Sequence, residues 1–378
     1  MIPSTTRYGY IDLFRGWAVI VMIEVHVVNA FLNPFYRENK IFDIVNFING
    51  IVAPSFLFLA GYSFMILLDR KREEFTYWSK LVLKNILRFI GILIVGYMLR
   101  IPFYSYQRIF TEVSDKLISN FLRVDILHCI SITMLILIFI FRFIKNQKIF
   151  VYLLSALIIL FVGFTNFMWS TDFNNILPLG IANYFNQTQG SLFPLFPWSS
   201  FLLTGTLTSY FWLKWRSDKY EQKYFLILLL IGCIFAIIGI TYQYFLKENS
   251  DQLYLRVSPF FFITRIGVVF VLLSFMWFWE QKFGTKKSAV AISGKESLLI
   301  YVCHLLVIYG MFIDEKSLAF IIKKTLLPNE VTIFSLILIL AMVSIGLIWN
   351  KIKIESSRLT SIIKILTFTI AIIYFFTN

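Results

Sequence analysis

Long apolar runs recur from one end of this 378-residue chain to the other, and several of them reach about 20 residues. A helix of that length spans the hydrocarbon core of a bilayer. Hydrophobic residues make up 58% of the chain, whereas soluble domains contain about 45–50%. We therefore predict an all-α integral membrane protein, a polytopic bundle of about 11 transmembrane helices. We find neither an internal repeat nor a linker, and so expect a single domain over residues 1–378.

The predicted spans are separated by polar or charged loops. They cover residues 10–33, 47–68, 81–101, 121–141, 149–169, a sixth span that enters through FPLFPWSSFLLTG, and then 224–246, 260–279, 291–312, 331–349 and 362–376.

The net charge of +14 is distributed unevenly along the chain. Lys and Arg concentrate in alternate loops, near residues 70–80, 142–148, 214–223, 282–287 and 351–358. Basic loops favour the cytoplasmic side of a membrane. This places the N-terminus in the cytoplasm and the C-terminus outside, and it explains the basicity without nucleic-acid binding.

The first predicted span, residues 10–33, carries ionisable side chains at membrane depth. Such groups are costly in a bilayer and mark functional sites. Helical geometry places Asp12 beside Arg15 and brings His26 back to nearly the same face about 16 Å further along, with Asn29 continuing the line. The result is a polar stripe past the midplane. The alternative is that Asp12 and Arg15 form a structural pair and that His26 is a core histidine.

All three histidines of the chain, His26, His128 and His304, fall inside apolar spans. We expect them to converge around one wet chamber. A neutral imidazole suits a general base or an acyl carrier. His26 is the predicted catalytic residue, with Asp125 and His128 as orienting or substrate-binding partners, and we include Arg15 and Asp12 of the same stripe in the predicted catalytic set. A metal is not expected, because the adjacent His–Cys pairs point about 100° apart on a helix.

Further polar residues extend the predicted site. Asp125 and His128 share one helix face, and Ser293 stands three residues before Glu296, the spacing of a capping box. The predicted substrate-binding residues are Arg123, Asp125, His128, His304 and Asn29, and the residues expected to hold an anionic donor at the cytoplasmic edge are Arg15, Lys295 and Ser293. Simple anchoring by the positive-inside bias explains Lys295 equally well.

Five segments together resemble a known family. DLFRGWAVIVMIEVH, APSFLFLAGYSF, RVDILHCIS, FPLFPWSSFLLTG and SGKESLLIYVCHLLVIY are similar, in that order, to blocks of the heparan-alpha-glucosaminide N-acetyltransferase catalytic-domain family. The similarity extends to about Tyr309. The spacing of Arg15 and His26 also resembles the signature of the wider transmembrane acyltransferase superfamily.

This resemblance implies an acyl-CoA-dependent acetyltransferase and supplies its partners. The enzyme would take acetyl-CoA from the cytoplasm and pass the acetyl group to an extracytoplasmic sugar amine or hydroxyl. The resemblance further implies a homodimer in the bacterial inner membrane, with His26 inheriting the catalytic histidine and Arg15 its partner. One feature departs from the family, because its lysosomal enzymes carry the active histidine just after the first helix, and residues 33–46 contain none here.

A transporter or exchanger is the rival interpretation, since buried His, Asp and Arg also describe a proton or substrate path. Paired repeats or interrupted helices would favour it, and the sequence displays neither. The acceptor, the acyl length, the choice between O- and N-acylation and the formation of an acyl-histidine stay open at this point.

Overall fold

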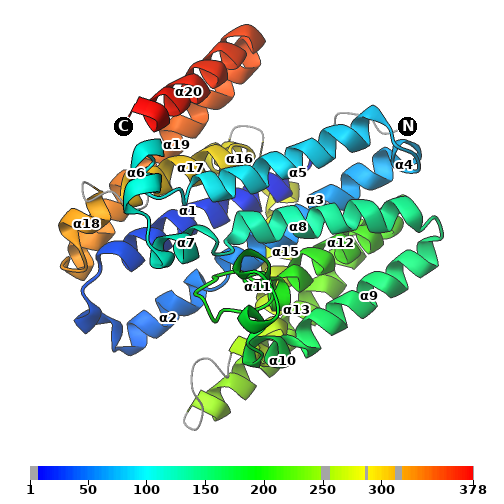
Figure 1. Ribbon diagram of the computed structural model, residues 1–378. Coiled ribbons are helices and arrows are strands. Elements are labelled where there is room, and N and C mark those ends of the chain that lie inside the picture. The colour runs from blue at the N-terminus through cyan, green and yellow to red at the C-terminus, as the bar shows by residue number, and fades with distance from the viewer. Residues whose placement is uncertain (1–6, 248–255, 286–287, 311–316, 378) are drawn as a thin grey trace. The chain divides into compact units, whose positions relative to one another are not determined.

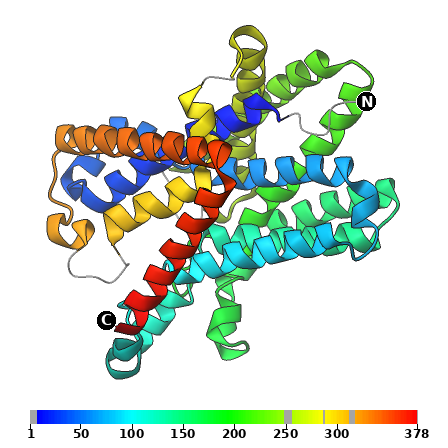
Figure 2. The same cartoon turned by 90° about the horizontal axis from the view of Figure 1, so that it is seen from above.

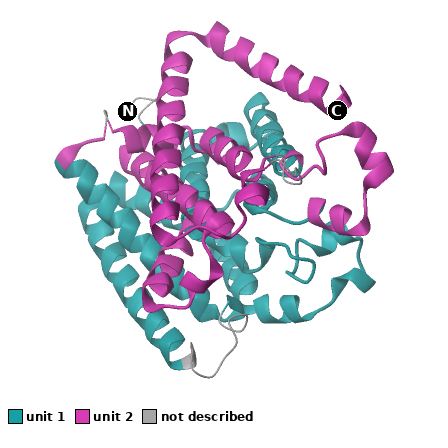
Figure 3. Cartoon of the chain, turned by 90° about the vertical axis from the view of Figure 1, so that its left-hand side faces the viewer, with its two compact units in different colours: residues 1–7, 53–97, 122–282 teal, residues 8–52, 98–121, 283–378 magenta. Residues whose placement is uncertain are grey.

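The computed structural model describes residues 7–247, 256–285, 288–310 and 317–377, and helices dominate them (Figure 1). These residues fall into two compact units (Figure 3). Unit 1 comprises residues 1–7, 53–97 and 122–282, and unit 2 comprises residues 8–52, 98–121 and 283–378. The single domain over residues 1–378 stays a prediction.

Unit 1 is built from the middle of the chain. Its elements are α3 (Val52–Arg70), α4 (Arg72–Phe75), α5 (Lys80–Met98), α8 (Ile126–Phe143), α9 (Gln147–Gly163), α10 (Thr165–Ser170), η2 (Phe173–Asn175), α11 (Leu179–Ala182), α12 (Leu195–Ser217), α13 (Glu221–Lys247) and α15 (Pro259–Phe283).

Unit 2 joins the first helix to the C-terminal part of the chain. Its elements are α1 (Gly9–Phe31), η1 (Pro34–Arg37), α2 (Lys40–Asn49), α6 (Tyr106–Glu112), α7 (Asp115–Phe121), α16 (Ala289–Lys295), α17 (Ser297–Tyr309), α18 (Leu318–Ile322), α19 (Pro328–Glu355) and α20 (Ser357–Thr377).

The helical content agrees with the predicted all-α membrane protein, but the number of spans does not reach the predicted eleven. Within the described ranges, seven helices are long and apolar enough to cross a membrane, or eight if the bent pair α16 and α17 forms one span. A helix lies in each of the eleven predicted stretches. The prediction of about 11 spans, and the orientation of the termini that depends on it, therefore stay unconfirmed.

In unit 2, α1 and α16 approach each other at backbone distance. A Cβ atom added to Gly16 would overlap the carbonyl oxygen of Val290, and one added to Gly294 would overlap the carbonyl oxygen of Asp12. Small residues allow such crossings in membrane helices, where close packing replaces the hydrophobic effect. The two glycines therefore set how closely α1 lies against α16.

The predicted span over residues 291–312 is broken. α16 ends at Lys295, α17 begins at Ser297, and the two helices meet at an angle of 87°. The sequence carries a signal here that the prediction did not use: the small and polar residues SGKES, over 293–297, lie between two apolar stretches, although no proline marks the bend. The prediction of a straight helix here is wrong, since long-range packing of Gly294 and Glu296 determines the local path.

Contacts between residues distant in sequence connect the elements of unit 2. The end of α1 is hydrogen-bonded to the segment before α19, through Leu326 N–H to the Phe31 carbonyl (3.0 Å) and Asn33 N–H to the Leu326 carbonyl (3.1 Å). α20 leaves α19 as a separate rod whose C-terminal end lies beside α6 (Figure 2), where Tyr106 meets Phe376 at a ring-centroid distance of 5.3 Å. The C-terminal end of the first helix is therefore joined to the segment that precedes α19.

Unit 1 uses the same close packing between α3 and α12. A Cβ atom on Gly61 would overlap the Leu202 carbonyl oxygen, and one on Gly205 would overlap the Phe58 carbonyl oxygen. Beneath this crossing, Thr133 of α8 and Ser199 of α12 join their hydroxyls at 2.8 Å. The helices of this unit are thus joined by small residues and short polar contacts, as membrane helices commonly are.

We expect Gly294→Ala to lower the thermal stability of the protein in detergent, because the new methyl group must displace the backbone of α1. Overpacking of this kind typically costs about 1–3 kcal/mol. Gly91→Ala is the matched control: Gly91 lies in α5 with no atom within 4 Å of an added Cβ, so the change should be neutral or slightly stabilising. Equal melting temperatures for both variants would contradict the proposed crossing.

Candidate active site

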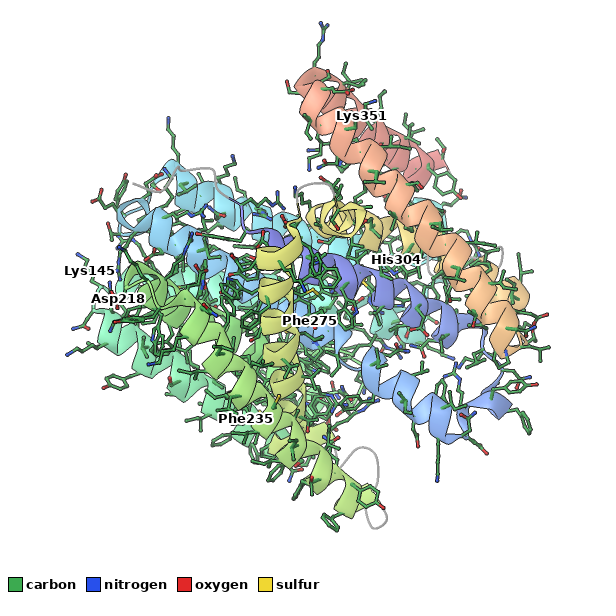
Figure 4. All side chains as sticks on the ribbon, turned by 180° about the vertical axis from the view of Figure 1, so that it is seen from behind. Lys145, Asp218, Phe235, Phe275, His304 and Lys351 are labelled. Atoms are coloured by element: carbon green, nitrogen blue, oxygen red, sulfur yellow. The ribbon has the colours of Figure 1, made fainter. Side chains whose placement is uncertain are left out.

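The helices α1 and α17 bring two histidines together in unit 2. The ring centroids of His26 and His304 lie 5.0 Å apart, with 52° between the ring planes. His304 is fully buried and His26 is half-buried. Figure 4 labels His304 in this region of unit 2. Two of the three histidines expected to converge therefore do so, although 278 residues separate them in sequence.

One hydrogen bond fixes the orientation of the His304 ring. Its Nδ1 lies 2.8 Å from the Ile300 carbonyl oxygen, one turn earlier in α17. A carbonyl can only accept, so Nδ1 carries the proton and Nε2 of the neutral ring keeps a lone pair. Nε2 is buried and has no hydrogen-bond partner among the residues that the structure describes. The ring, whose centroid lies 5.0 Å from that of His26, thus keeps one nitrogen that can accept a proton.

Two tyrosines flank the histidine pair. The ring of Tyr309 packs edge-on against His26 at 6.0 Å, and its hydroxyl donates to the His26 backbone carbonyl at 3.4 Å. Tyr301 lies 5.8 Å from His304. Neither tyrosine was predicted from the sequence, although Tyr301 stands about one helical turn before His304 and therefore lies on the same helix face.

The other end of α1 carries the expected ion pair. Arg15 Nη1 lies 3.7 Å from Asp12 Oδ1, and Asp12 is buried. The predicted pairing at i and i+3 is confirmed. Eleven residues separate Arg15 from His26, which corresponds to about 16 Å along the helix. Asn29, predicted to bind substrate, lies one turn beyond His26 and its side chain is exposed.

The predicted capping box of Ser293 and Glu296 is wrong. Ser293 lies inside α16 and donates its hydroxyl to the Ala289 carbonyl at 3.0 Å. Glu296 instead accepts from Lys353 of α19 at 2.9 Å on both carboxylate oxygens, and from Asn350 at 3.0 Å. A partner 57 residues away outcompetes the local cap, and no local pattern could have revealed it.

This ion pair defines the corner between α16 and α17. The Glu296 side chain is only 5% exposed and occupies the break itself. A buried carboxylate needs a charged or hydrogen-bonded partner, which Lys353 and Asn350 supply. Lys295, predicted to hold a donor, is the last residue of α16 and is half-buried. It stands next to this corner, so its charge lies near the pair.

The third histidine, His128, belongs to unit 1 and has a clear role in capping a helix. The backbone N–H of Asp125 donates to His128 Nδ1 at 3.1 Å, and Asp125 Oδ1 accepts from the Ile126 N–H at 2.7 Å. The two side chains together form the N-terminal cap of α8. Tyr97 packs against the imidazole at 4.2 Å. Their predicted role in substrate binding stays a prediction beside this structural one.

The segment before α8 is tied to the polar loop over residues 170–192. Arg123 Nε donates to the Gln189 carbonyl at 3.0 Å, and the Ser191 hydroxyl accepts from the Val124 N–H at 3.1 Å. In the same loop, burial and a hydrogen bond with Tyr97 raise the pKa of the Tyr184 hydroxyl. Tyr184 therefore stays protonated at physiological pH. Arg123 thus anchors the polar loop to the segment before α8. Its predicted role in substrate binding stays a prediction.

Comparison with family models decides the relationship that these motifs indicate. Residues 7–234 match the model of the catalytic region of heparan-alpha-glucosaminide N-acetyltransferase. The chain belongs to this family. The match includes four of the five resembling segments, while the fifth, which begins at Ser293 and contains His304, lies beyond it. Comparison with the curated proteins gave no match.

Membership makes the chain a membrane acetyltransferase by family, and it places His26 and Arg15 inside the matched region. The histidine that the lysosomal relatives carry after the first helix has no counterpart at residues 33–46. In the described structure, that stretch forms η1 and the start of α2. His26 is the histidine of the matched segment that lies beside a second imidazole.

Asp125 can be tested for the two roles that it could fill. Asp125→Asn keeps an oxygen that accepts from the Ile126 N–H, whereas Asp125→Ala removes the cap. We expect Ala to destabilise the protein by about 1 kcal/mol and Asn to leave both thermal unfolding and acetyl transfer close to wild type. An Asn variant that melts normally but loses activity would instead assign the carboxylate to substrate binding.

Proposed function

We propose that this protein transfers an acetyl group from acetyl-CoA to the amine or hydroxyl of a saccharide on the opposite side of the membrane. The family gives the chemistry, an N-acetyl transfer to a glucosaminide. The pair of His26 and His304 carries the proposal. Two imidazoles side by side, one of them buried with a lone pair, are suited to acyl transfer and proton transfer.

His26 is the proposed transfer residue. It is half-buried, so substrates can reach its ring, while His304 is enclosed. As a base it would take the proton of the acceptor. As a nucleophile it would carry the acetyl group between the thioester and the acceptor. Both routes place the reacting carbonyl carbon within reach of the His26 ring nitrogens.

The donor would bind toward the opposite end of α1. Its phosphates require cationic partners, and Arg15 lies about 16 Å from His26 along the helix axis. The pantetheine arm of CoA is long enough to cover such a distance. Lys295 adds a second cation beside the corner of α16 and α17. The buried Asp12 holds Arg15 by its pair at 3.7 Å, and Ser293 supports the helix from within.

The acceptor and the assembly are proposed by analogy with the family. A glucosaminide amine is the proposed acceptor class, and the bacterial inner membrane and a homodimer are the proposed setting. A transporter remains the rival function, and one observation bears on it. α16 and α17 form a broken helix, a feature that transporters also use at their binding sites. Transport would move solute without consuming acetyl-CoA, which separates the two functions experimentally.

We expect His26→Ala to slow the release of CoA from acetyl-CoA in the presence of glucosamine by several orders of magnitude, to a small residual rate, because the transfer residue is gone. The affinity for CoA should stay within a few-fold of wild type, since the histidine lies far from the phosphates. Release of free thiol and calorimetric titration with CoA measure the two quantities on purified protein. Full turnover in this variant would end the assignment of His26.

Arg15→Gln is the complementary variant, and we expect it to weaken CoA affinity more than it slows CoA release at saturating acetyl-CoA. We expect weaker CoA binding by about 10-fold or more, because a charged hydrogen bond to phosphate is worth about 1.5–3 kcal/mol. The double variant Asp12→Asn, Arg15→Gln is the control. It also removes the buried Asp12 carboxylate, which loses its ion pair with Arg15 in the single variant. Restored binding in the double variant would show that Arg15 acts only by neutralising Asp12.

A further inference from the structure

His304 differs from the other polar groups of unit 2 in having an unused basic nitrogen. Its Nδ1–H is engaged by the Ile300 carbonyl at 2.8 Å, its side chain is 0% exposed, and Nε2 has no hydrogen-bond partner in the described ranges. An unpaired buried polar atom costs about 1–3 kcal/mol. Such a cost persists in a structure most readily where function needs the atom.

The geometry around this nitrogen assigns it to the chemistry of His26. The centroids of the two rings lie 5.0 Å apart, Tyr301 lies 5.8 Å from His304, and Tyr309 lies 6.0 Å from His26. We propose that Nε2 of His304 is the general base that receives the proton of the acceptor while His26 carries the acetyl group. This inference rests on the acetyl transfer proposed above and adds a second catalytic residue, outside the segment that the family model matches.

The proposed reaction has two steps, acetylation of His26 and transfer of the acetyl group to the acceptor. A ring nitrogen of His26 attacks the thioester carbonyl, a C–N bond forms, the C–S bond breaks, and CoA leaves as a thiolate. The acceptor nitrogen then attacks the acetyl carbon, its proton moves to His304 Nε2, and the bond to His26 breaks with its electron pair returning to the ring. The proton on His304 finally neutralises the thiolate, which restores both imidazoles.

The bond to Ile300 explains why the roles are not interchangeable. With Nδ1 fixed as a donor, His304 offers only Nε2, and the ring cannot turn without losing a buried hydrogen bond. A fixed, enclosed ring suits proton transfer. A nucleophile must meet the thioester carbonyl, and the half-buried His26 is the more accessible of the two.

His304→Asn is the informative variant, because the Asn amide can still donate to the Ile300 carbonyl while the basic nitrogen is removed. Purified wild type and variant are compared with glucosamine and with hydroxylamine as acetyl acceptors at equal acetyl-CoA. Hydroxylamine attacks acyl groups without help from a base. Thermal unfolding and CoA titration of the same samples report on folding and donor binding.

We expect transfer to glucosamine to fall by about 100-fold or more, the usual contribution of a general base, while transfer to hydroxylamine falls by less than about 10-fold. Equal losses with both acceptors, or no loss with either, would overturn the base role of His304 and would leave the proposed acetyl transfer standing. His304→Gln should behave like Asn, since its amide is not basic. Wild-type protein that releases CoA no faster than a protein-free blank with either acceptor would instead refute the proposed function itself.

Discussion

The backbone contact between α1 and α16 is the constraint on which the rest of unit 2 depends. Gly16 faces the Val290 carbonyl and Gly294 faces the Asp12 carbonyl, so the helices meet with no side chain between them. Through this contact, α1 lies against the end of α16, two residues before Glu296 and the turn into α17. The chain turns by 87° there, α17 also contacts α1, and His304 lies beside His26. Two glycines and one ion pair thus position a pair of imidazoles.

The same arrangement separates the chemistry into two regions of one helix. Asp12 and Arg15 occupy the end of α1 near α16, and His26 lies about 16 Å further on. A donor with phosphates at one end and a reactive thioester at the other fits this separation. A proton path for transport along α1 would need further protonatable side chains between Arg15 and His26 on the same helix face. Glu24 is the charged residue in that interval, on a different face from the stripe.

Much of this organisation follows from the sequence, and the failures have a common cause. Apolar length placed a helix in each of the eleven stretches, and i, i+3 spacing predicted the pair of Asp12 and Arg15. Local spacing also suggested a capping box at Ser293, but Glu296 pairs with Lys353 instead. The helix break falls within the small and polar stretch SGKES, but its angle also depends on contacts with α1 and α19 that are distant in sequence. Long-range partners decide what single-sequence patterns leave open.

The central claim is that His26 and His304 act as one unit in acetyl transfer, and a double-mutant cycle on transfer to glucosamine tests it most directly. For residues that share one step, the effects are strongly non-additive. We predict that the double variant His26→Ala, His304→Asn is no slower than His26→Ala alone. Losses that multiply, so that the double variant falls by the product of the two single effects, would show that the histidines act independently.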